Sequence, residues 1–440
     1  MSTPREADTV LPSLGVALAP ARRGAMTRSI AAITIANGLE FFDFAVYTYF
    51  ATIIGKLFFP ATSSITQLLM SLATFGVGFF ARPLGGFVIG SYADRVGRKA
   101  AMTLSLWLMA AGSAVFVVVP TYAQIGAAAP VLLIIGRLIQ GFAVGGEAGA
   151  STSMLLEYAG HHNRGFFASW QLFSQALSTI LGSLIGLALT MALTHEQLLS
   201  WGWRLPFLAG IALIPIGSYI RRHLDESHAE ARSSRSQRSP LAQVFREHRG
   251  KLVLGTLITA GATSSNYMAL HYLTNYAVGV LKMPLSAGMW ASLVAGGLEM
   301  LLAAFAGIAS DRWGRKPVAT WSRIALLVSI VPAFAWLSAA PDLTRLLTVA
   351  AVMIVPTVFI TVAATAMIAE FFPRAVRATA VSIVYGLGVS IFGGFAQFLA
   401  TWLIAATGSK LAPAGYLIVT GVVALVAVLM SEEMAGKPLK

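Results

Sequence analysis

The chain consists of long apolar runs separated by short polar stretches. Each run is long enough to cross a bilayer, because about 20 mostly apolar residues in a helix span the hydrocarbon core. Pro60, Pro120, Pro284 and Pro341 lie between runs, where residues that cannot continue a helix are expected. The pattern predicts an all-α membrane protein with twelve transmembrane helices, centred on residues 30–57, 66–92, 100–119, 128–156, 165–193, 203–220, 252–280, 286–309, 317–338, 344–370, 378–405 and 411–430.

Two longer polar stretches divide the chain. Residues 1–28 contain several arginines and prolines and lack the uninterrupted apolar core of a signal peptide. Residues 221–251 are rich in Arg and Glu and follow the sixth apolar run. The predicted organisation is a cytoplasmic N-terminal tail (1–28), an N-terminal six-helix bundle (29–222), a cytoplasmic central loop (223–250), a C-terminal six-helix bundle (251–430) and a short cytoplasmic tail (431–440).

The amino-acid composition excludes several classes of protein and site. Only 11% of the 440 residues are charged, against roughly 25% in soluble domains, which excludes a soluble enzyme. The chain has no cysteine, so disulfides, thiolate metal sites and cysteine nucleophiles are excluded too. The net charge of +13 does not indicate nucleic acid, because most of the 31 Lys and Arg fall in the loops of one membrane side. The positive-inside rule makes that side the cytoplasm, with both termini inside.

One loop sequence occurs twice. Gly90–Lys99 (GSYADRVGRK) matches Gly307–Lys316 (GIASDRWGRK) at a shift of 217 residues. An acid seven residues before an arginine also recurs, as Glu157 with Arg164 and Glu370 with Arg377. Both copies fall on the predicted cytoplasmic side, so the two halves run parallel. Two six-span halves related in this way, with a site between them, are the architecture of a secondary transporter.

The repeated loop has two interpretations. Its Asp closes a helix and its Gly permits a tight turn, while its Arg and Lys face acidic groups or phospholipid. If the Asp also pairs with the opposite half, the loop is a latch that closes the cytoplasmic mouth; otherwise its charges only fix the topology. The latch explains the repeated Asp and Gly better, so we expect a cytoplasmic gate built from Asp94, Arg98, Asp311, Arg315, Glu157, Arg164, Glu370 and Arg377.

The duplicated loops resemble the signature loop of the major facilitator superfamily, and residues 136–141 (GRLIQG) resemble its fourth-helix motif. Four further segments resemble the metabolite:proton symporter branch: residues 37–44, 81–86, 145–147 and 200–207. The similarity covers about residues 28–430. It implies proton-coupled import of citrate, tricarballylate, 2-oxoglutarate, shikimate or a zwitterionic osmolyte across the bacterial inner membrane. Residues 169–171, 340–345 and 372–374 look most similar to citrate and tricarballylate carriers.

Carboxylates within the predicted spans are candidates for proton coupling. An ionisable side chain at the membrane centre costs at least about 2.5–3.5 kcal/mol, so it is expected to have a function. Glu40 and Asp43 share one helix face near mid-membrane, and their mutual repulsion favours a bound proton on one of them. The alternative is a structural pair neutralised by Arg82. Glu147 in span four completes the expected proton-coupling set.

Cations and a further carboxylate within the spans are candidates for substrate binding. Arg82 and Glu299 each lie 12 residues before the Asp of their loop copy, so they hold equivalent positions in the two halves. Arg82 contacts either the substrate or Asp43. Arg137 is a good receptor for a carboxylate, because its planar fork donates two hydrogen bonds. A structural salt bridge to Glu147 or Glu40 is the alternative.

Neutral polar side chains extend the expected substrate site. Gln171 and Gln175 share one face of span five, and span seven contributes a histidine that could also titrate or simply pack. The full expected set is Asn37, Arg82, Arg137, Gln171, Gln175, His271, Tyr272, Asn275, Tyr276 and Glu299. Tyrosines at span ends are often only interfacial anchors. Arg323, close to a cytoplasmic end, is expected to snorkel to the surface.

The sequence therefore predicts a secondary active transporter that imports a small organic carboxylate with protons, most simply citrate or a related tricarboxylate. No phosphate-binding GxxxxGKS loop and no metal-ligand cluster is present, so neither ATP coupling nor a cofactor is expected. A membrane-embedded enzyme would need a paired nucleophile and base, which the spans lack. The alternatives are import of 2-oxoglutarate, shikimate or proline/betaine, drug export, and coupling to Na⁺; a monomer is expected.

Overall fold

Long apolar helices make up most of the described chain. The computed structural model describes residues 34, 37–38, 41–96, 98–145, 159, 162–212, 240–373 and 376–437. Eight of its helices are long and apolar enough to cross a membrane, and a ninth span is formed by a bent pair. The regular elements, in chain order after the helix Phe41–Tyr49, are α2 (Ala51–Phe58), α3 (Ser64–Val96), α4 (Arg98–Val118), α5 (Tyr122–Ile125), α6 (Ala128–Gly145), α8 (Arg164–Ala192), α9 (His195–Ser200), η1 (Gly202–Arg204), α11 (Pro240–Glu247), α12 (Arg249–Tyr267), η2 (Met268–Tyr272), α13 (Leu273–Asn275), η3 (Tyr276–Val280), α14 (Leu285–Trp313), α15 (Arg315–Ala339), α16 (Leu343–Glu370), α17 (Arg377–Leu387), η4 (Gly388–Gly393), α18 (Ala396–Thr407) and α19 (Ala412–Met430).

The described helices agree with the twelve expected spans. Besides the nine spans recognised by length and apolar character, α4 and α12 with its continuation to η3 supply two more, and residues 205–212 are the described start of a further helix. The described residues contain no strand. The all-α fold is therefore confirmed. One detail differs from the sequence prediction: the first span is not one continuous helix, because Phe41–Tyr49 and α2 meet at 64°.

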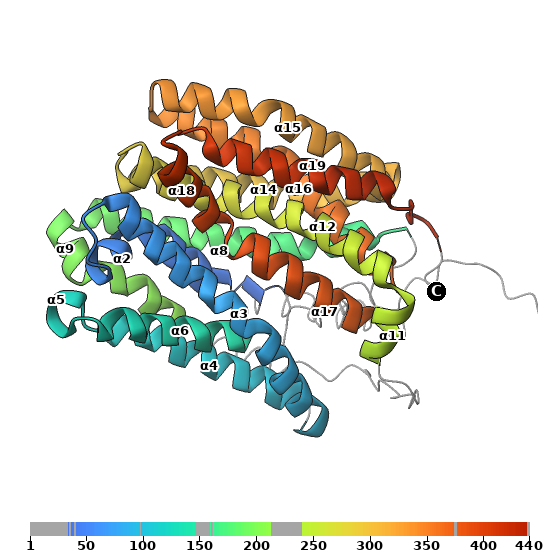
Figure 1. The fold of residues 1–440 in the computed structure, drawn as a ribbon, viewed down its shortest axis with the longest axis horizontal. Helices are drawn as coiled ribbons and strands as arrows, with labels where there is room; N and C mark the ends of the chain where they lie inside the picture. The colour runs from blue at the N-terminus through green and yellow to red at the C-terminus, as the bar shows by residue number, and fades with distance from the viewer. Residues whose placement is uncertain are drawn as a thin grey trace, which may run out of the picture.

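The long helices lie side by side, with α15 and α19 along one edge of the molecule and α4 and α6 along the other (Figure 1). Helices α8 and α14 pack against each other between these edges and join the two halves. Large apolar side chains such as Phe87 and Trp321 are more than 70% exposed on outward faces. Such an apolar surface is what lipid contact requires.

Glycines permit two close helix contacts that position the site. A side chain at Gly141 of α6 would collide with the carbonyl of Gly78, so α3 and α6 touch backbone to backbone. Gly165 of α8 and Gly307 of α14 make a similar contact between the halves, because a Cβ on either would lie within 2.7 Å of the other's carbonyl oxygen. Small residues at helix crossings are typical of membrane proteins.

Helix α12 continues through two π-helical segments, η2 and η3, and a third, η4, interrupts the span of α17 and α18. A π-helical turn holds an extra residue, and such turns are frequent at functional sites. His271 and Asn275, two of the expected site residues, lie in or directly after η2.

Candidate functional site

Asp43 is the centre of a buried polar cluster inside the N-terminal half. The side chain is 2% exposed, and its Oδ2 accepts hydrogen bonds from the Ser113 hydroxyl and, at 3.4 Å, from the Gln140 amide. Gln140 also donates to Ser113 at 2.9 Å and accepts from Arg137 at 2.7 Å. We call these four residues the Asp43 cluster. It connects a carboxyl group to a guanidinium group through one amide, which suits a group that gains and loses a proton.

Arg137 is enclosed by aromatic rings of its own half. The guanidinium carbon lies 3.7 Å from the centre of the Tyr47 ring, with Phe44, Phe75 and Phe116 within 5.7 Å. The side chain is fully buried. In this structure α6 turns the side chain toward the first span, where it joins the Asp43 cluster and contacts Tyr47. The expected substrate contact of Arg137 stays a prediction. Glu40 and Glu147 lie outside the described residues.

Arg82, in contrast, lies where the two halves meet. Its guanidinium stacks on Phe79 at 3.9 Å and lies 4.9 Å from the Phe44 ring centre. The Phe79 ring packs against Tyr267 of the C-terminal half, with 6.0 Å between centroids, and the charge of Arg82 acts on the Tyr267 hydroxyl. Arg82 is thus the described intramembrane arginine that the structure places next to both halves.

Polar side chains from both halves surround this interface. His271 lies between Tyr49 and Tyr267, with ring centroids 5.9 and 5.5 Å away. Asn266 of α12 donates a 3.3 Å hydrogen bond to Gln175 of α8, which links the halves directly. The structure therefore brings His271 and Gln175 to the same interface as Arg82.

Asn37 and Gln171 are buried within the N-terminal half. Asn37 donates to the Ser174 hydroxyl at 2.5 Å, which joins the first span to α8. Gln171 is one turn away on α8, and its carbonyl accepts the Ser174 hydroxyl.

Three other expected substrate residues have hydrogen-bond partners of their own. Tyr276 donates to the carbonyl of Lys410 at 2.9 Å, so it fastens a loop at the end of α18. Tyr272 lies 3.4 Å from the Thr401 hydroxyl within the C-terminal half. Asn275 donates to Gln397, which reaches Thr48 of the other half at 3.5 Å. The sequence prediction placed Tyr272 and Tyr276 in the site because they share a helix face; in the structure Tyr272 lies beside Thr401 of α18, and Tyr276 packs on Phe334 of α15.

Glu299 of α14 is fully buried, and neither of its carboxyl oxygens has a hydrogen-bond partner among the described residues. Its charge acts on Tyr49 of the first span. The residue therefore lies at the interface, as expected, but without the partner that a buried carboxylate needs.

At the predicted cytoplasmic end, charged residues of the two halves interlock. Asp311 accepts hydrogen bonds from the backbone N–H groups of Gly165 and Phe166, at 2.8 and 2.9 Å, where the N-terminus of α8 favours negative charge. Arg315 pairs with Asp311 at 2.7 Å and with Glu370 at 3.1 Å. Glu370 also pairs with Arg164 of the other half at 3.3 Å.

We call Arg164, Asp311, Arg315 and Glu370 the gate cluster. The structure thus brings four of the expected gate residues together across the two halves. Arg377 bonds instead to the Phe372 carbonyl at 3.2 Å. Glu157 and the side chains of Asp94 and Arg98 lie outside the described part of the chain.

Comparison with known proteins identifies the family. The model of the family described as "Sugar (and other) transporter" matches residues 29–229 and 218–440. The chain belongs to this transporter family of the major facilitator superfamily. The membership expected from the repeated loops is therefore confirmed, and the protein is a multi-pass membrane transporter.

Relatives of this transporter carry different substrates. It is 35% identical over 408 residues to the citrate-proton symporter of Salmonella typhi, covering 91% of this chain and 93% of that protein. It is 31% identical over 433 residues to the glycine betaine/proline/ectoine/pipecolic acid transporter OusA of Dickeya dadantii, covering 95% and 85%. The solved proton:xylose symporter XylE of E. coli superposes with a TM-score of 0.71 at 16% identity, covering 95% of this chain and 98% of that chain, which shows the fold alone.

Two contacts of this transporter were missed by sequence reasoning. Glu433, after the last span, accepts the backbone N–H groups of Arg315 and Lys316 at 3.1 and 2.8 Å and so caps α15. Arg164 donates to the Lys437 carbonyl at 3.2 Å, so the C-terminal tail reaches the gate cluster. The sequence feature that could have indicated these contacts is the acidic residue after the last apolar run.

Arg323 does not snorkel. It is 3% exposed and donates to the Gly261 carbonyl and the Ser265 hydroxyl of α12, at 3.0 and 2.7 Å. The expectation was wrong because α15 turns this side chain toward α12, whose backbone and hydroxyl oxygens supply the acceptors that water would otherwise provide.

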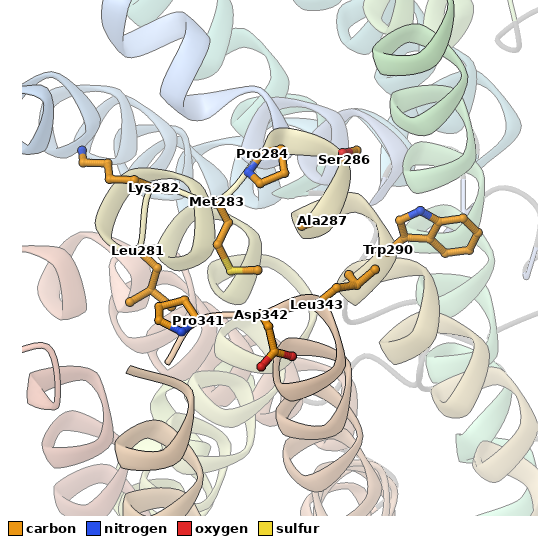
Figure 2. A pocket seen from close by; sticks show the side chains of 10 residues that line it. All are labelled: Leu281, Lys282, Met283, Pro284, Ser286, Ala287, Trp290, Pro341, Asp342 and Leu343. Carbon is orange, nitrogen blue, oxygen red and sulfur yellow. The ribbon is translucent and has the colours of Figure 1, made fainter. Parts of the chain in front are cut away.

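A hollow of about 620 Å³ opens at the end of the transporter opposite the gate cluster. Figure 2 shows that its lining comes from the segment before α14, from the first turns of α14 and from the loop that leads into α16. Asp342 in its wall accepts from the backbone N–H of Arg345 and so caps α16. The hollow therefore lies apart from Arg82 and the Asp43 cluster.

We expect Glu370→Gln to open the gate. Removing the carboxylate leaves Arg164 and Arg315 buried without it, and loss of one partner from a buried ion pair costs about 3–5 kcal/mol. Since the chain has no native cysteine, Ser169→Cys, at a buried position near the start of α8, reports the opening. The maleimide labelling rate of this reporter is expected to rise more than tenfold.

Asp342→Asn is the matched control for the gate. It removes an ion pair between Asp342, whose carboxylate is 51% exposed, and Arg345, and exposed pairs contribute little. Labelling of the Ser169→Cys reporter is expected to stay at the rate seen with an intact gate. An equal rise in both variants would show that the gate cluster does not hold the two halves together.

Proposed function

We propose that this transporter imports a small organic anion together with protons, with citrate or a related tricarboxylate as the substrate. The observation that carries the proposal is the separation of two charged centres. Asp43 is enclosed within the N-terminal half, while Arg82 lies at the interface between the halves. A proton on the first and an anion at the second can then be carried in one conformational cycle. The citrate-proton symporter relative supports this assignment.

Arg82 would bind a substrate carboxylate with two parallel hydrogen bonds, which a planar guanidinium can make. His271 and the linked pair of Gln175 and Asn266 would donate to further carboxylate or hydroxyl groups. Asp43 would take its proton from the side to which the site is open and release it on the other. The Asp43 cluster needs no contact with the substrate to do so, because the movement of the halves couples the two events.

The proposed orientation follows the positive-inside rule, with both termini in the cytoplasm of a bacterial cell and the transporter in its inner membrane. The gate cluster then closes the cytoplasmic mouth. We further propose residues 29–222 and 251–430 as the two moving halves, and a single chain as the working unit. Transport, with no catalytic step, is the assigned activity.

A zwitterionic osmolyte is the second candidate. The relative OusA carries such compounds, and Tyr49 and Tyr267 at the interface offer aromatic faces of the kind that bind quaternary ammonium groups. Arg82 would then hold the single carboxylate. The two candidates differ in net charge, which an uptake assay resolves.

Uptake into proteoliposomes tests the proposal. With an acidic exterior we expect accumulation of labelled citrate that a protonophore abolishes and that needs no Na⁺. A panel of 2-oxoglutarate, shikimate, proline and betaine, each offered alone and as a competitor, gives the specificity. Concentrative uptake of betaine without citrate uptake would favour the osmolyte; Na⁺-dependent uptake, or uptake of no organic anion by folded protein, would contradict proton-coupled anion import.

A further inference from the structure

Glu299 lies in the middle of the contact between the two halves. Three contacts define how α8 and α14 run past each other in opposite directions: Gly307 meets Gly165, Gly296 meets Thr179, and Met289 meets Gly186. This register places Glu299 opposite residue 176. It is therefore level with Gln175, whose amide oxygen accepts a hydrogen bond from the other half.

Cations on the neighbouring elements lie far from Glu299 or are engaged elsewhere. The titratable residues of the described elements packed against α14 are Arg164, His271, Tyr272, Tyr276, Arg315, Lys316, Arg323, Arg345 and Glu370. Those of the gate cluster lie near Asp311, 12 residues or about 18 Å along α14. Arg345, in the first turn of α16, pairs with the N-cap residue Asp342, and Arg323 bonds to α12.

Among the residues that the structure describes, none that carries a positive charge pairs with Glu299. Tyr49 is a titratable neighbour of Glu299, and the His271 ring lies with its centroid 5.9 Å from that of Tyr49. An ionised carboxylate that is fully buried without a partner is far less stable than the neutral acid. In this closed arrangement Glu299 therefore holds a proton.

We propose that Glu299, in the C-terminal half, is a second proton-carrying group and that it takes up its proton when the substrate binds. This inference rests on the proposed anion import. When the halves separate, water reaches the interface and the carboxyl can lose its proton to water. When the site closes on an anion beside Gln175, the ionised form would be both desolvated and repelled by the substrate, so a proton from the open side must bind first. One proton is thus taken up on one side and released on the other.

The coupling ratio tests this proposal. With the membrane potential clamped at zero, each coupled proton contributes a factor of about ten in accumulation for each unit of pH gradient. We expect Glu299→Gln to lower the limiting citrate accumulation about tenfold at a one-unit gradient, and Glu299→Asp to restore it. Unchanged accumulation in Glu299→Gln would overturn the proposal. If citrate binding depends on Na⁺ in the wild-type protein but not in Glu299→Gln, Glu299 binds sodium and the proposal is overturned.

A second measurement does not depend on transport by the Glu299 variant. In weakly buffered detergent solution at pH 8, citrate binding to the wild-type protein is expected to take up protons, and Glu299→Gln to take up one fewer. If Glu299→Gln binds no citrate, infrared spectra of Asp43→Asn with and without citrate test whether Glu299 takes up the proton. A protonated-carboxyl band that appears with citrate supports Glu299, and its absence overturns the role. Wild-type protein that binds citrate without proton uptake would contradict the proposed function itself.

Discussion

Proton-driven accumulation of citrate is expected to fall about tenfold in the Asp43→Asn variant at a one-unit pH gradient, while exchange of external for internal citrate continues. An amide is similar in size to the carboxyl group but cannot gain or lose the proton. A one-unit pH gradient supplies about 1.4 kcal/mol per proton, a factor of about ten in accumulation. Accumulation should therefore fall about tenfold, to the ratio that the remaining proton on Glu299 supports. Uptake and counterflow in the same proteoliposomes measure both quantities.

Ser113→Ala is the matched control for Asp43. It removes the hydroxyl that donates to the carboxyl group but keeps the carboxyl itself. Coupled accumulation is expected to persist in this variant. If accumulation is lost in Ser113→Ala and retained in Asp43→Asn, the proton is carried elsewhere, and the assignment to the Asp43 cluster is wrong.

Substrate affinity is expected to fall about a hundredfold in Arg82→Gln. Hydrogen bonds to charged groups contribute about 1.5–3 kcal/mol each, so loss of the guanidinium from the interface removes the main attraction for a carboxylate. Arg82→Lys should retain part of the affinity, because an ammonium keeps the charge but not the two parallel donors. Calorimetric titration of citrate measures the effect directly.

Arg204→Gln provides the comparison for Arg82. This arginine bonds to the carbonyls of Ser200 and Val119 and stacks on Trp203, outside the interface. Its removal should leave citrate affinity unchanged. Equal affinity losses in both variants would indicate a general effect of charge, and an unaltered affinity in Arg82→Gln would exclude Arg82 from the substrate site.

The architecture could be predicted from the sequence because it depends on local composition. A run of about twenty apolar residues is stable in a bilayer as a spanning helix, and the repeated loops define the two halves. The break at Phe50 was not predictable, since the sequence there contains neither Pro nor Gly. It depends on how the first span packs against its neighbours.

The candidate site could be predicted only in part. Residue spacing shows which side chains share a face of a helix, but not which part of the protein that face contacts. Arg82 and Arg137 are both arginines within a span, yet one lies at the interface and the other is enclosed by rings of its own half. For the gate, the spacing paired Glu370 with Arg377 along the chain. In the structure Glu370 pairs with Arg164, 206 residues away.

The C-terminal segment after α19 is attached to both halves of the transporter. Glu433 is fixed to the start of α15 in one half, and the carbonyl of Lys437 is bonded to Arg164 in the other. Four residues span at most about 14 Å when fully extended. Small separations of the halves leave both attachments intact, whereas a wider opening must detach one end. The widest opening of the halves is therefore expected to require release of this C-terminal segment from one of them.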